Sequence, residues 1–393
     1  MTYAERWLLP DGVEDILPEK AARIESMRRS LLDLYGRWGY EMIIPPMVEY
    51  TDSLLIGLGQ DIDLLTFKVM DQLTGRTMGI RADITPQTAR IDAHSLRRDG
   101  VSRLCYASHV LYTKPKSPLG TRSPLQAGVE LYGEEGLGAD VEVMSLLLSS
   151  LQEVGLEKLN MDLGHVAIYR GLVEAAGLND SQEKEFFDLL QSKAVTELNA
   201  WADQLSVNED AAAMLKVLPL LAGDRTVLAR ARDALWGAPV SVAKALDELD
   251  AVAEVLEQRY PQADLYFDLA ELRGARYHTG LVFAAFAPGY GTALANGGRY
   301  DHVGGVFGNG RPATGFSVDV TALDQLLSHE QQQQSAIFAH FSPDPEQWNA
   351  ITELRKAGEK VVTGFAGQEV KDITIRCDRQ LVLKDGQYLV VDL

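Results

Sequence analysis

The order of helix and strand patterns is the feature that most restricts the fold of this chain. Apolar side chains recur every three or four residues over 17–38, and 139–155 has a similar pattern, which predicts two amphipathic helices. Apolar runs bounded by turn residues predict strands at 103–112 and 125–133. The predicted strands and helices form separate blocks and do not alternate regularly. Blocks of this kind favour an α+β fold with a largely antiparallel sheet.

Proline and glycine refine the N-terminal part of this prediction. The segment GYEMIIPPMVEY contains Pro45 and Pro46, which cannot donate to a strand ladder, so it predicts an edge strand or the entry to a strand and not a buried central strand. Residues 65–82 predict a hairpin that turns around Gly75. The fragment VMDQLTGRT within it is also similar to phosphoribosyl-pyrophosphate loops, where backbone N–H groups hold phosphate. Those loops carry adjacent acidic residues, whereas Asp71 stands alone, so a plain hairpin turn is the preferred interpretation.

The second half of the chain predicts two further parts. Residues 171–261 are charged and helix-forming, with Asp180 and Glu183 at the spacing of a capping box, which predicts a helical insertion. The run HEQQQQS at 329–335 predicts a linker that ends a first domain at residue 328. Strand, helix, strand and hairpin patterns follow, so we expect a small C-terminal α/β domain over 336–393.

Composition excludes several classes of protein. Apolar residues make up 46% and charged residues 24% of 393, as in a folded globular protein, and no apolar run approaches the roughly 18 residues of a membrane helix. Cys105 and Cys377 are too few for a disulfide framework or a Cys-rich zinc centre. We therefore expect a cytoplasmic protein without metal, cofactor or membrane contact. The chain also has no P-loop and no nucleophile elbow, and scattered histidines such as His165 favour a structural role.

Net charge bears on nucleic-acid binding. Asp and Glu outnumber Lys and Arg by 56 to 37, which gives a net charge of −19. Binding tRNA depends on basic side chains that neutralise phosphates, so this balance argues against it. The alternative, that the acidity only aids solubility, is equally compatible with the composition.

One segment contains a candidate for carboxylate recognition. In ELRGARYHTG, Arg273 stands close to Tyr277 and His278, so the guanidinium could bind a carboxylate while the two rings line a flat pocket. A surface arginine beside core aromatics is the alternative, and spacing alone leaves both open. The glycine-rich run over 297–315 is weak evidence by itself, because glycines serve tight turns as often as ligands.

Together, segments between residues 9 and 327 resemble histidyl-tRNA synthetase, a class II aminoacyl-tRNA synthetase. GYEMIIPPMVEYT is similar to the dimer-forming motif 1, with Pro46 at the motif proline, and LPDGVEDILPEKA to the opening of that family. IRADITPQTAR resembles the amino-acid-binding segment, and RLCYASHVLYTKPKSPLGTRSPLQAGVELYG resembles the motif 2 hairpin. LRGARYHTG is similar to the histidine-specific motif and NGGRYDHV to its usual successor.

The resemblance implies that aminoacyl-adenylate chemistry is lost. Tyr112 and Lys114 stand where motif 2 of the synthetases has Arg and Glu, and Ala322 stands where motif 3 ends in Arg. Each arginine–phosphate contact is worth about 1.5–3 kcal/mol, so losing both removes much of the stabilisation that adenylation needs. About 58 residues follow the Gln-rich run, too few for the synthetases' anticodon-binding domain.

The same resemblance implies that a histidine pocket is retained. By position in the motifs, Glu130 would bind the imidazole, and Gln126, Asp83 and Thr85 would face the α-ammonium. The carboxylate would lie near Arg273, with Tyr277 beside it and with His278 in place of the second motif tyrosine. The predicted binding set is Asp83, Thr85, Gln126, Glu130, Arg273, Tyr277 and His278.

These features resemble the synthetase paralogues that serve as regulatory subunits of ATP phosphoribosyltransferase, the first enzyme of histidine biosynthesis. The resemblance implies a non-catalytic chain that activates a short-form catalytic subunit and transmits inhibition by L-histidine. It also implies a hetero-octamer with four chains of each kind, self-association through motif 1, and no tRNA partner. Two alternatives are an active histidyl-tRNA synthetase and another pseudo-synthetase, either an amino-acid sensor or an RNA-binding scaffold.

Overall fold

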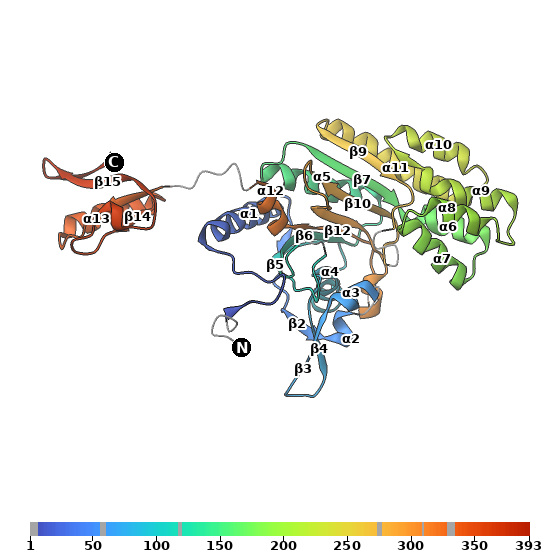
Figure 1. Ribbon diagram of the computed structural model, residues 1–393, viewed down its shortest axis with the longest axis horizontal. Coiled ribbons are helices and arrows are strands. Elements are labelled where there is room, and N and C mark those ends of the chain that lie inside the picture. Colours follow the sequence, from blue (N-terminus) through green and yellow to red (C-terminus); the bar gives the residue numbers. More distant parts are fainter. Residues whose placement is uncertain (1–6, 56–59, 117–119, 273–276, 309, 328–334) are drawn as a thin grey trace. The chain divides into compact units, whose positions relative to one another are not determined.

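The chain, in a computed structural model, divides into two compact units, Met1–Ser328 and His329–Leu393 (Figure 1). The structure describes residues 7–55, 60–116, 120–272, 277–308, 310–327 and 335–393. The predicted linker at 329–335 therefore lies, apart from Ser335, outside the described residues.

A nine-stranded sheet forms the centre of the first unit, in the order β1-β5-β6-β12-β11-β10-β7-β9-β8. Only the pairs β1/β5 and β7/β9 are parallel, so the predicted α+β class with a largely antiparallel sheet is confirmed. In chain order the strands are β1 (Glu41–Met42), β5 (Ser102–His109), β6 (Leu125–Tyr132), β7 (Leu159–His165), β8 (Ala222–Gly223), β9 (Ala263–Asp268), β10 (Leu281–Phe286), β11 (Ala295–Arg299) and β12 (Ala313–Asp319).

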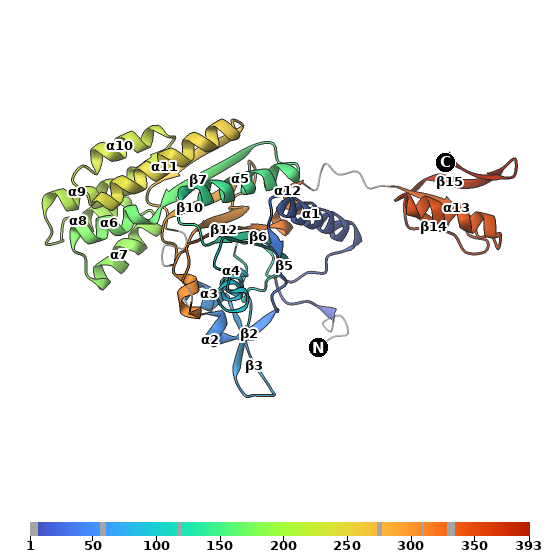
Figure 2. The same cartoon turned by 180° about the vertical axis from the view of Figure 1, so that it is seen from behind.

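Helices cover one face of this sheet (Figures 1 and 2). They are α1 (Pro18–Arg37), α5 (Leu137–Glu153), α11 (Val240–Arg259) and α12 (Val320–Leu327). In the central strands of the sheet, alternate residues such as Val129, Phe283 and Phe316 are buried in the core under these helices. Because strand side chains alternate between faces, their neighbours along the strands point to the opposite face. That opposite face holds the polar side chains of the candidate site.

The chain segment between β1 and β5 forms a small three-stranded sheet, in the order β2-β4-β3. Its strands are β2 (Val48–Tyr50), β3 (Phe67–Met70) and β4 (Thr77–Ile80), with the short helices α2 (Thr51–Leu54) and α3 (Gln60–Leu65) between them. The predicted hairpin is confirmed, since β3 and β4 pair antiparallel and Gly75 takes a positive φ of 72°. Asp71 accepts a hydrogen bond from Thr74 Oγ1 (2.6 Å) within the turn, as expected for a plain turn. The paired prolines lie between β1 and β2, just before the entry to β2, and both of these are edge strands, as expected of a segment that is not a buried centre.

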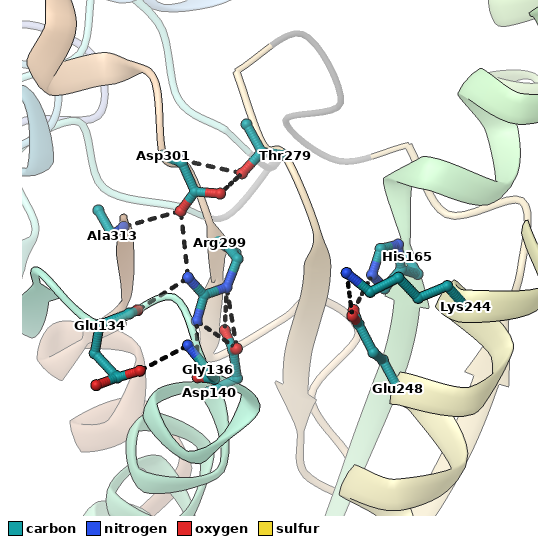
Figure 3. Close-up of polar contacts among 10 residues, drawn as sticks. All are labelled: Glu134, Gly136, Asp140, His165, Lys244, Glu248, Thr279, Arg299, Asp301 and Ala313. Carbon is teal, nitrogen blue, oxygen red and sulfur yellow. Dashed lines mark hydrogen bonds and ion pairs between the residues drawn. The ribbon is translucent and has the colours of Figure 1, made fainter. Parts of the chain in front are cut away.

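The first helix in the region of the expected helical insertion begins at Val166. His165 caps this helix, because its Nδ1 accepts the N–H of Ala167 (3.2 Å), while its Nε2 contacts Glu248 (2.9 Å; Figure 3). This histidine is structural, as expected. The helices are α6 (Val166–Ala176), α7 (Asp180–Gln191), α8 (Val195–Ala202), α9 (Glu209–Val217) and α10 (Thr226–Ala234), followed by α11.

The predicted capping box was placed one residue too far along the chain. Asn179, not Asp180, is the N-cap of α7, and its side chain accepts the N–H groups of Ser181 and Gln182 (3.1 Å each). Gln182 returns a contact to the N–H of Asn179 (3.0 Å), which completes the box. Asp and Asn are both good N-caps, so sequence could not decide between the two adjacent positions.

The second unit contains a four-stranded sheet in the order β14-β13-β15-β16, with one helix. Its elements are β13 (Ala336–Ala339), α13 (Pro345–Lys356), β14 (Val361–Thr363), β15 (Cys377–Lys384) and β16 (Gln387–Asp392). Ile337, Ile351 and Leu381 form its own small core. The predicted hairpin is present, and Asp385 and Gly386 both have positive φ (49° and 77°), as a tight hairpin turn requires. Nowhere in the described residues of either unit is there a helix both long and apolar enough to cross a membrane.

Candidate functional site

Glu130 lies on the sheet face opposite the helices. It is on β6, directly across from Leu104 on β5 and from Gly315 on β12. A Cβ atom at position 315 would overlap the Glu130 carboxylate, so glycine is needed there for the carboxylate to lie over the sheet. The strand register therefore explains both the position of the acid and the glycine beside it.

The carboxylate of Glu130 is enclosed by hydroxyl groups. Thr85 Oγ1 (2.9 Å) and the hydroxyl of Tyr106 (3.1 Å) donate to Oε1, and the hydroxyl of Tyr300 donates to Oε2. Glu130 is 1% exposed, and burial raises its pKa to about 8 even though these donors act in the opposite direction. Within the described part of the chain it has no ion-pair partner. Such a carboxylate lacks the positive charge or extra donor that a ligand could supply.

A second acid lies beside it, at the start of α4 (Thr85–Arg90), which continues into a π-helical turn at Ile91–Leu96. Asp83 Oδ1 accepts the N–H of Ile84 (2.7 Å) and the amide of Gln126 (3.2 Å), and lies 3.3 Å from Thr85 Oγ1. The network holds the side chains of Asp83 and Gln126 in fixed orientations.

The ring pair lies on the chain segment that leads into β10. The rings of Tyr277 and His278 are 4.2 Å apart between centroids and tilted by 44°. The carbonyl of His278 accepts a hydrogen bond from the guanidinium of Arg170 on α6 (2.8 Å). The predicted Arg273, together with its neighbour Arg276, lies outside the described residues.

The structure brings the six described residues of the predicted set together. Asp83, Thr85, Gln126, Glu130, Tyr277 and His278 all line one cavity of about 250 Å³. Residues that sequence reasoning did not include also line it, among them Lys116, Asp162, Glu271, Asn296 and Tyr300. Its lining is rich in carboxyl groups, which favours a ligand that carries positive charge. Among the residues that the structure describes, no three His, Cys, Asp or Glu side chains converge as metal ligands would.

Tyr300 was the most important omission, together with Tyr106. Tyr300 immediately follows the NGGR segment, and only the register of β11 with β12 shows that its hydroxyl meets Glu130. The nearby signal was the glycine pair at 297 and 298, since glycines in a strand indicate close approach by another group.

A second cavity of about 370 Å³ adjoins the first and shares Lys116 and Asn296 with it. Tyr112 and Ala322 both line it. The basic side chain among its described lining residues is Lys116. Tyr112 and Ala322 thus face one space, and their side chains bring no positive charge to it.

This fold, with a cavity on the open face of a largely antiparallel sheet, defines a protein of the class II aminoacyl-tRNA synthetase type. The histidyl-tRNA synthetase family matches residues 12–323, and the ATP phosphoribosyltransferase subunit HisZ C-terminal domain matches residues 334–391. The ATP phosphoribosyltransferase regulatory subunit of Cellvibrio japonicus is 59% identical over 393 residues, covering 100% of this chain and 98% of that protein. The chain belongs to the family of ATP phosphoribosyltransferase regulatory subunits.

Solved structures agree with this fold. An ATP phosphoribosyltransferase regulatory subunit/histidyl-tRNA synthetase from Bacillus halodurans C matches with a TM-score of 0.81 and 29% identity, covering 93% of this chain and 95% of that one. A chain from the ATP phosphoribosyl transferase (HisG:HisZ) complex of Thermotoga maritima matches with a TM-score of 0.58 at 17% identity, covering 75% of this chain and 96% of that one. The second likeness concerns the fold alone.

Proposed function

We propose that this chain is a non-catalytic subunit that activates a short-form ATP phosphoribosyltransferase and makes it sensitive to inhibition by L-histidine. Membership in the regulatory-subunit family supports this proposal. The Thermotoga maritima structure is described as a HisG:HisZ complex, so a protein with a similar fold assembles with a second polypeptide. A subunit of a biosynthetic enzyme of this kind would work in the cytoplasm.

The enclosure of Glu130 is the observation that carries the proposal. A carboxyl group that is 1% exposed and bonded to hydroxyl groups can accept a further donor from the cavity. The imidazole of histidine offers an N–H group at either ring nitrogen and becomes positively charged when protonated. Asp83 and Gln126, on the same cavity, suit an α-ammonium group, which is a donor only.

The non-catalytic part of the proposal rests on the second cavity. Transfer of a nucleotidyl group depends on positive charges that stabilise the phosphates in the transition state. Tyr112 and Ala322 supply none, and the described lining of that cavity offers the ammonium of Lys116. We infer that the chain keeps amino-acid recognition without adenylate formation.

Regulation requires that histidine bind one arrangement of the complex better than another, typically with about 1–3 kcal/mol of coupling.

We propose that this complex contains four chains of each kind and that two copies of this chain associate through the motif 1 segment. Exposed apolar side chains support that surface, since Met42, Ile44 and Met47 are 48%, 79% and 43% exposed at the sheet edge.

Calorimetric titration of the full-length chain with L-histidine tests the proposed site. The unmodified chain should bind histidine, and Glu130→Gln, which keeps the side-chain shape, should weaken binding by about ten- to a hundredfold. Glu135→Gln is the matched control, because Glu135 is close in sequence but exposed. No binding by the unmodified chain would contradict the proposal, and unchanged binding by Glu130→Gln would place the histidine site elsewhere.

A further inference from the structure

The end of strand β11 connects two walls of the cavity that come from different parts of the chain. Its last residue, Arg299, is followed by Tyr300, whose hydroxyl donates to Glu130 in the carboxyl wall. Arg299 and Asp301, on either side of Tyr300, both contact Thr279. Thr279 directly follows Tyr277 and His278. The consecutive residues 299–301 therefore connect the cavity wall that contains Glu130 to the cavity wall that contains these two rings.

The contacts with Thr279 fix both its backbone and its side chain. Its N–H donates to the carbonyl of Arg299 (2.7 Å), and its hydroxyl donates to Asp301 Oδ2 (2.8 Å). The same hydroxyl oxygen accepts the N–H of Asp301 (3.1 Å; Figure 3). Asp301 Oδ1 in turn accepts the N–H of Ala313 on β12 (3.0 Å). The residue after the rings is therefore held by a closed set of hydrogen bonds.

Arg299 ties this set to the first turn of α5. Its guanidinium contacts Asp140 through Nη2 (2.6 Å) and Nε (3.0 Å), and Nη1 reaches the carbonyl of Glu134 (3.2 Å) and Asp301 (3.3 Å; Figure 3). The side chains of Arg299 and Asp140 are 10% and 2% exposed, so the ion pair is well shielded from solvent. A Cβ atom at position 280 would lie 3.1 Å from Arg299 Cδ, which shows how closely the arginine stem passes the backbone after Thr279.

We infer that Thr279, Arg299 and Asp301 form a positioning bracket, which sets the distance between the Tyr277–His278 rings and the Glu130 carboxylate and so determines which ring-bearing ligands the cavity accepts. These three residues are absent from the cavity lining, whereas both rings, Tyr300 and Glu130 belong to it. The bracket therefore acts through the position of the walls and not by contact with the ligand. This inference rests on the proposed function, because it takes histidine as the ligand.

A merely structural role and a positioning role differ in a measurable way. A variant that only lowers the fraction of binding-competent chain weakens every ligand by the same factor, so the ratio of two dissociation constants stays constant. A variant that lets the rings move relative to Glu130 changes how well a ring nitrogen meets the carboxylate. That change alters the ratio between ligands whose rings differ.

Thr279→Val and Thr279→Ser are the matched pair for this test. Valine keeps the shape of threonine but removes the hydroxyl that contacts Asp301, whereas serine keeps the hydroxyl. The full-length variants would be titrated with L-histidine and with 1,2,4-triazole-3-alanine, which has a similar shape but a different arrangement of ring nitrogens. We expect Thr279→Val to bind histidine about tenfold more weakly and to discriminate less between the two ligands. Thr279→Ser should keep discrimination close to that of the unmodified chain.

Each other outcome overturns a distinct claim. Equal weakening of both ligands by Thr279→Val, or no weakening, would overturn the positioning role while leaving histidine binding intact. Absence of histidine binding by the unmodified chain would overturn the proposed function and this inference with it. Thermal unfolding of each variant shows whether it is folded, and Thr279→Ala serves in the same comparison if the valine variant does not fold.

Discussion

Gly315 lies directly opposite Glu130 in the register of β12 and β6, and the Glu130 carboxylate occupies the space that a side chain at position 315 would fill. The acid is thus fixed from two sides. The hydroxyl donors hold its oxygen atoms, and the bare backbone of the neighbouring strand leaves them room. A site that depends on such a close contact should be sensitive to a single added methyl group.

Gly315→Ala should therefore weaken histidine binding, with at least a tenfold rise in the dissociation constant measured by calorimetry. The reason is steric, because the new Cβ atom would overlap both the Glu130 carboxylate and the backbone carbonyl of Val129, so the carboxylate must move away from its hydroxyl donors. Gly138→Ala on α5 is the control, since a Cβ atom there meets nothing within 4 Å. A Gly315→Ala chain that binds histidine normally would show that Glu130 does not need its observed position.

The stability of the chain should depend on pH through Glu130. Burial raises the pKa of its carboxyl group from 4.5 to about 8, so between these values the folded chain holds a proton that the unfolded chain has released. This contribution to stability is complete below the unfolded pKa and is lost as the pH rises toward about 8. Glutamine does not titrate, so Glu130→Gln lacks this loss.

Chemical denaturation at several pH values between about 6 and 8 measures the effect. The free energy of unfolding of the unmodified chain should fall relative to that of Glu130→Gln by up to about 1.4 kcal/mol per pH unit. Glu135→Gln, at an exposed glutamate, is the control variant. A difference between the unmodified chain and Glu130→Gln that does not change with pH would mean that Glu130 is ionised throughout.

Sequence periodicity predicted several elements of this fold but not the contacts between them. The first helix, expected at 17–38, spans Pro18–Arg37, because its apolar stripe repeats without interruption. The capping of α6 by His165 was not predicted, because histidine is not a usual N-cap.

The candidate site was predictable only where a motif carried it. Glu130 and Gln126 were found because the β6 segment resembles motif 2, and both line the cavity. Tyr300 was not found, because the contact of its hydroxyl with Glu130 depends on the register of neighbouring strands, which residue spacing does not encode. The ion pair of Arg299 with Asp140 could likewise not be predicted, since the two residues are far apart in sequence.

We expect the chain to be without adenylation activity. Tyr112 and Ala322 line the same cavity and supply no positive charge there, so histidine-dependent exchange of pyrophosphate into ATP should not exceed background. An authentic histidyl-tRNA synthetase assayed in parallel is the positive control. Exchange by the unmodified chain at a comparable rate would support an active synthetase instead.

Self-association should depend on the edge segment between β1 and β2. Ile44 is 79% exposed there, and a charge placed in an apolar contact between two copies would be costly. Ile44→Asp should shift the mass measured by light scattering from a dimer of this chain toward a monomer. Leu383→Asp, at a residue of the second unit that is 57% exposed, should leave the mass unchanged. If Ile44→Asp keeps the mass of the unmodified chain, the interface lies elsewhere.

The central claim is that this chain activates a catalytic partner and conveys histidine inhibition through Glu130. The most direct measurement is the rate of ATP phosphoribosyl transfer by a short-form catalytic subunit, alone and with this chain, during titration with L-histidine. We predict that the unmodified chain raises the rate and that histidine then lowers it. Glu130→Gln should activate equally but resist histidine. A rate unaffected by the chain, or an unchanged histidine response with Glu130→Gln, would contradict this account.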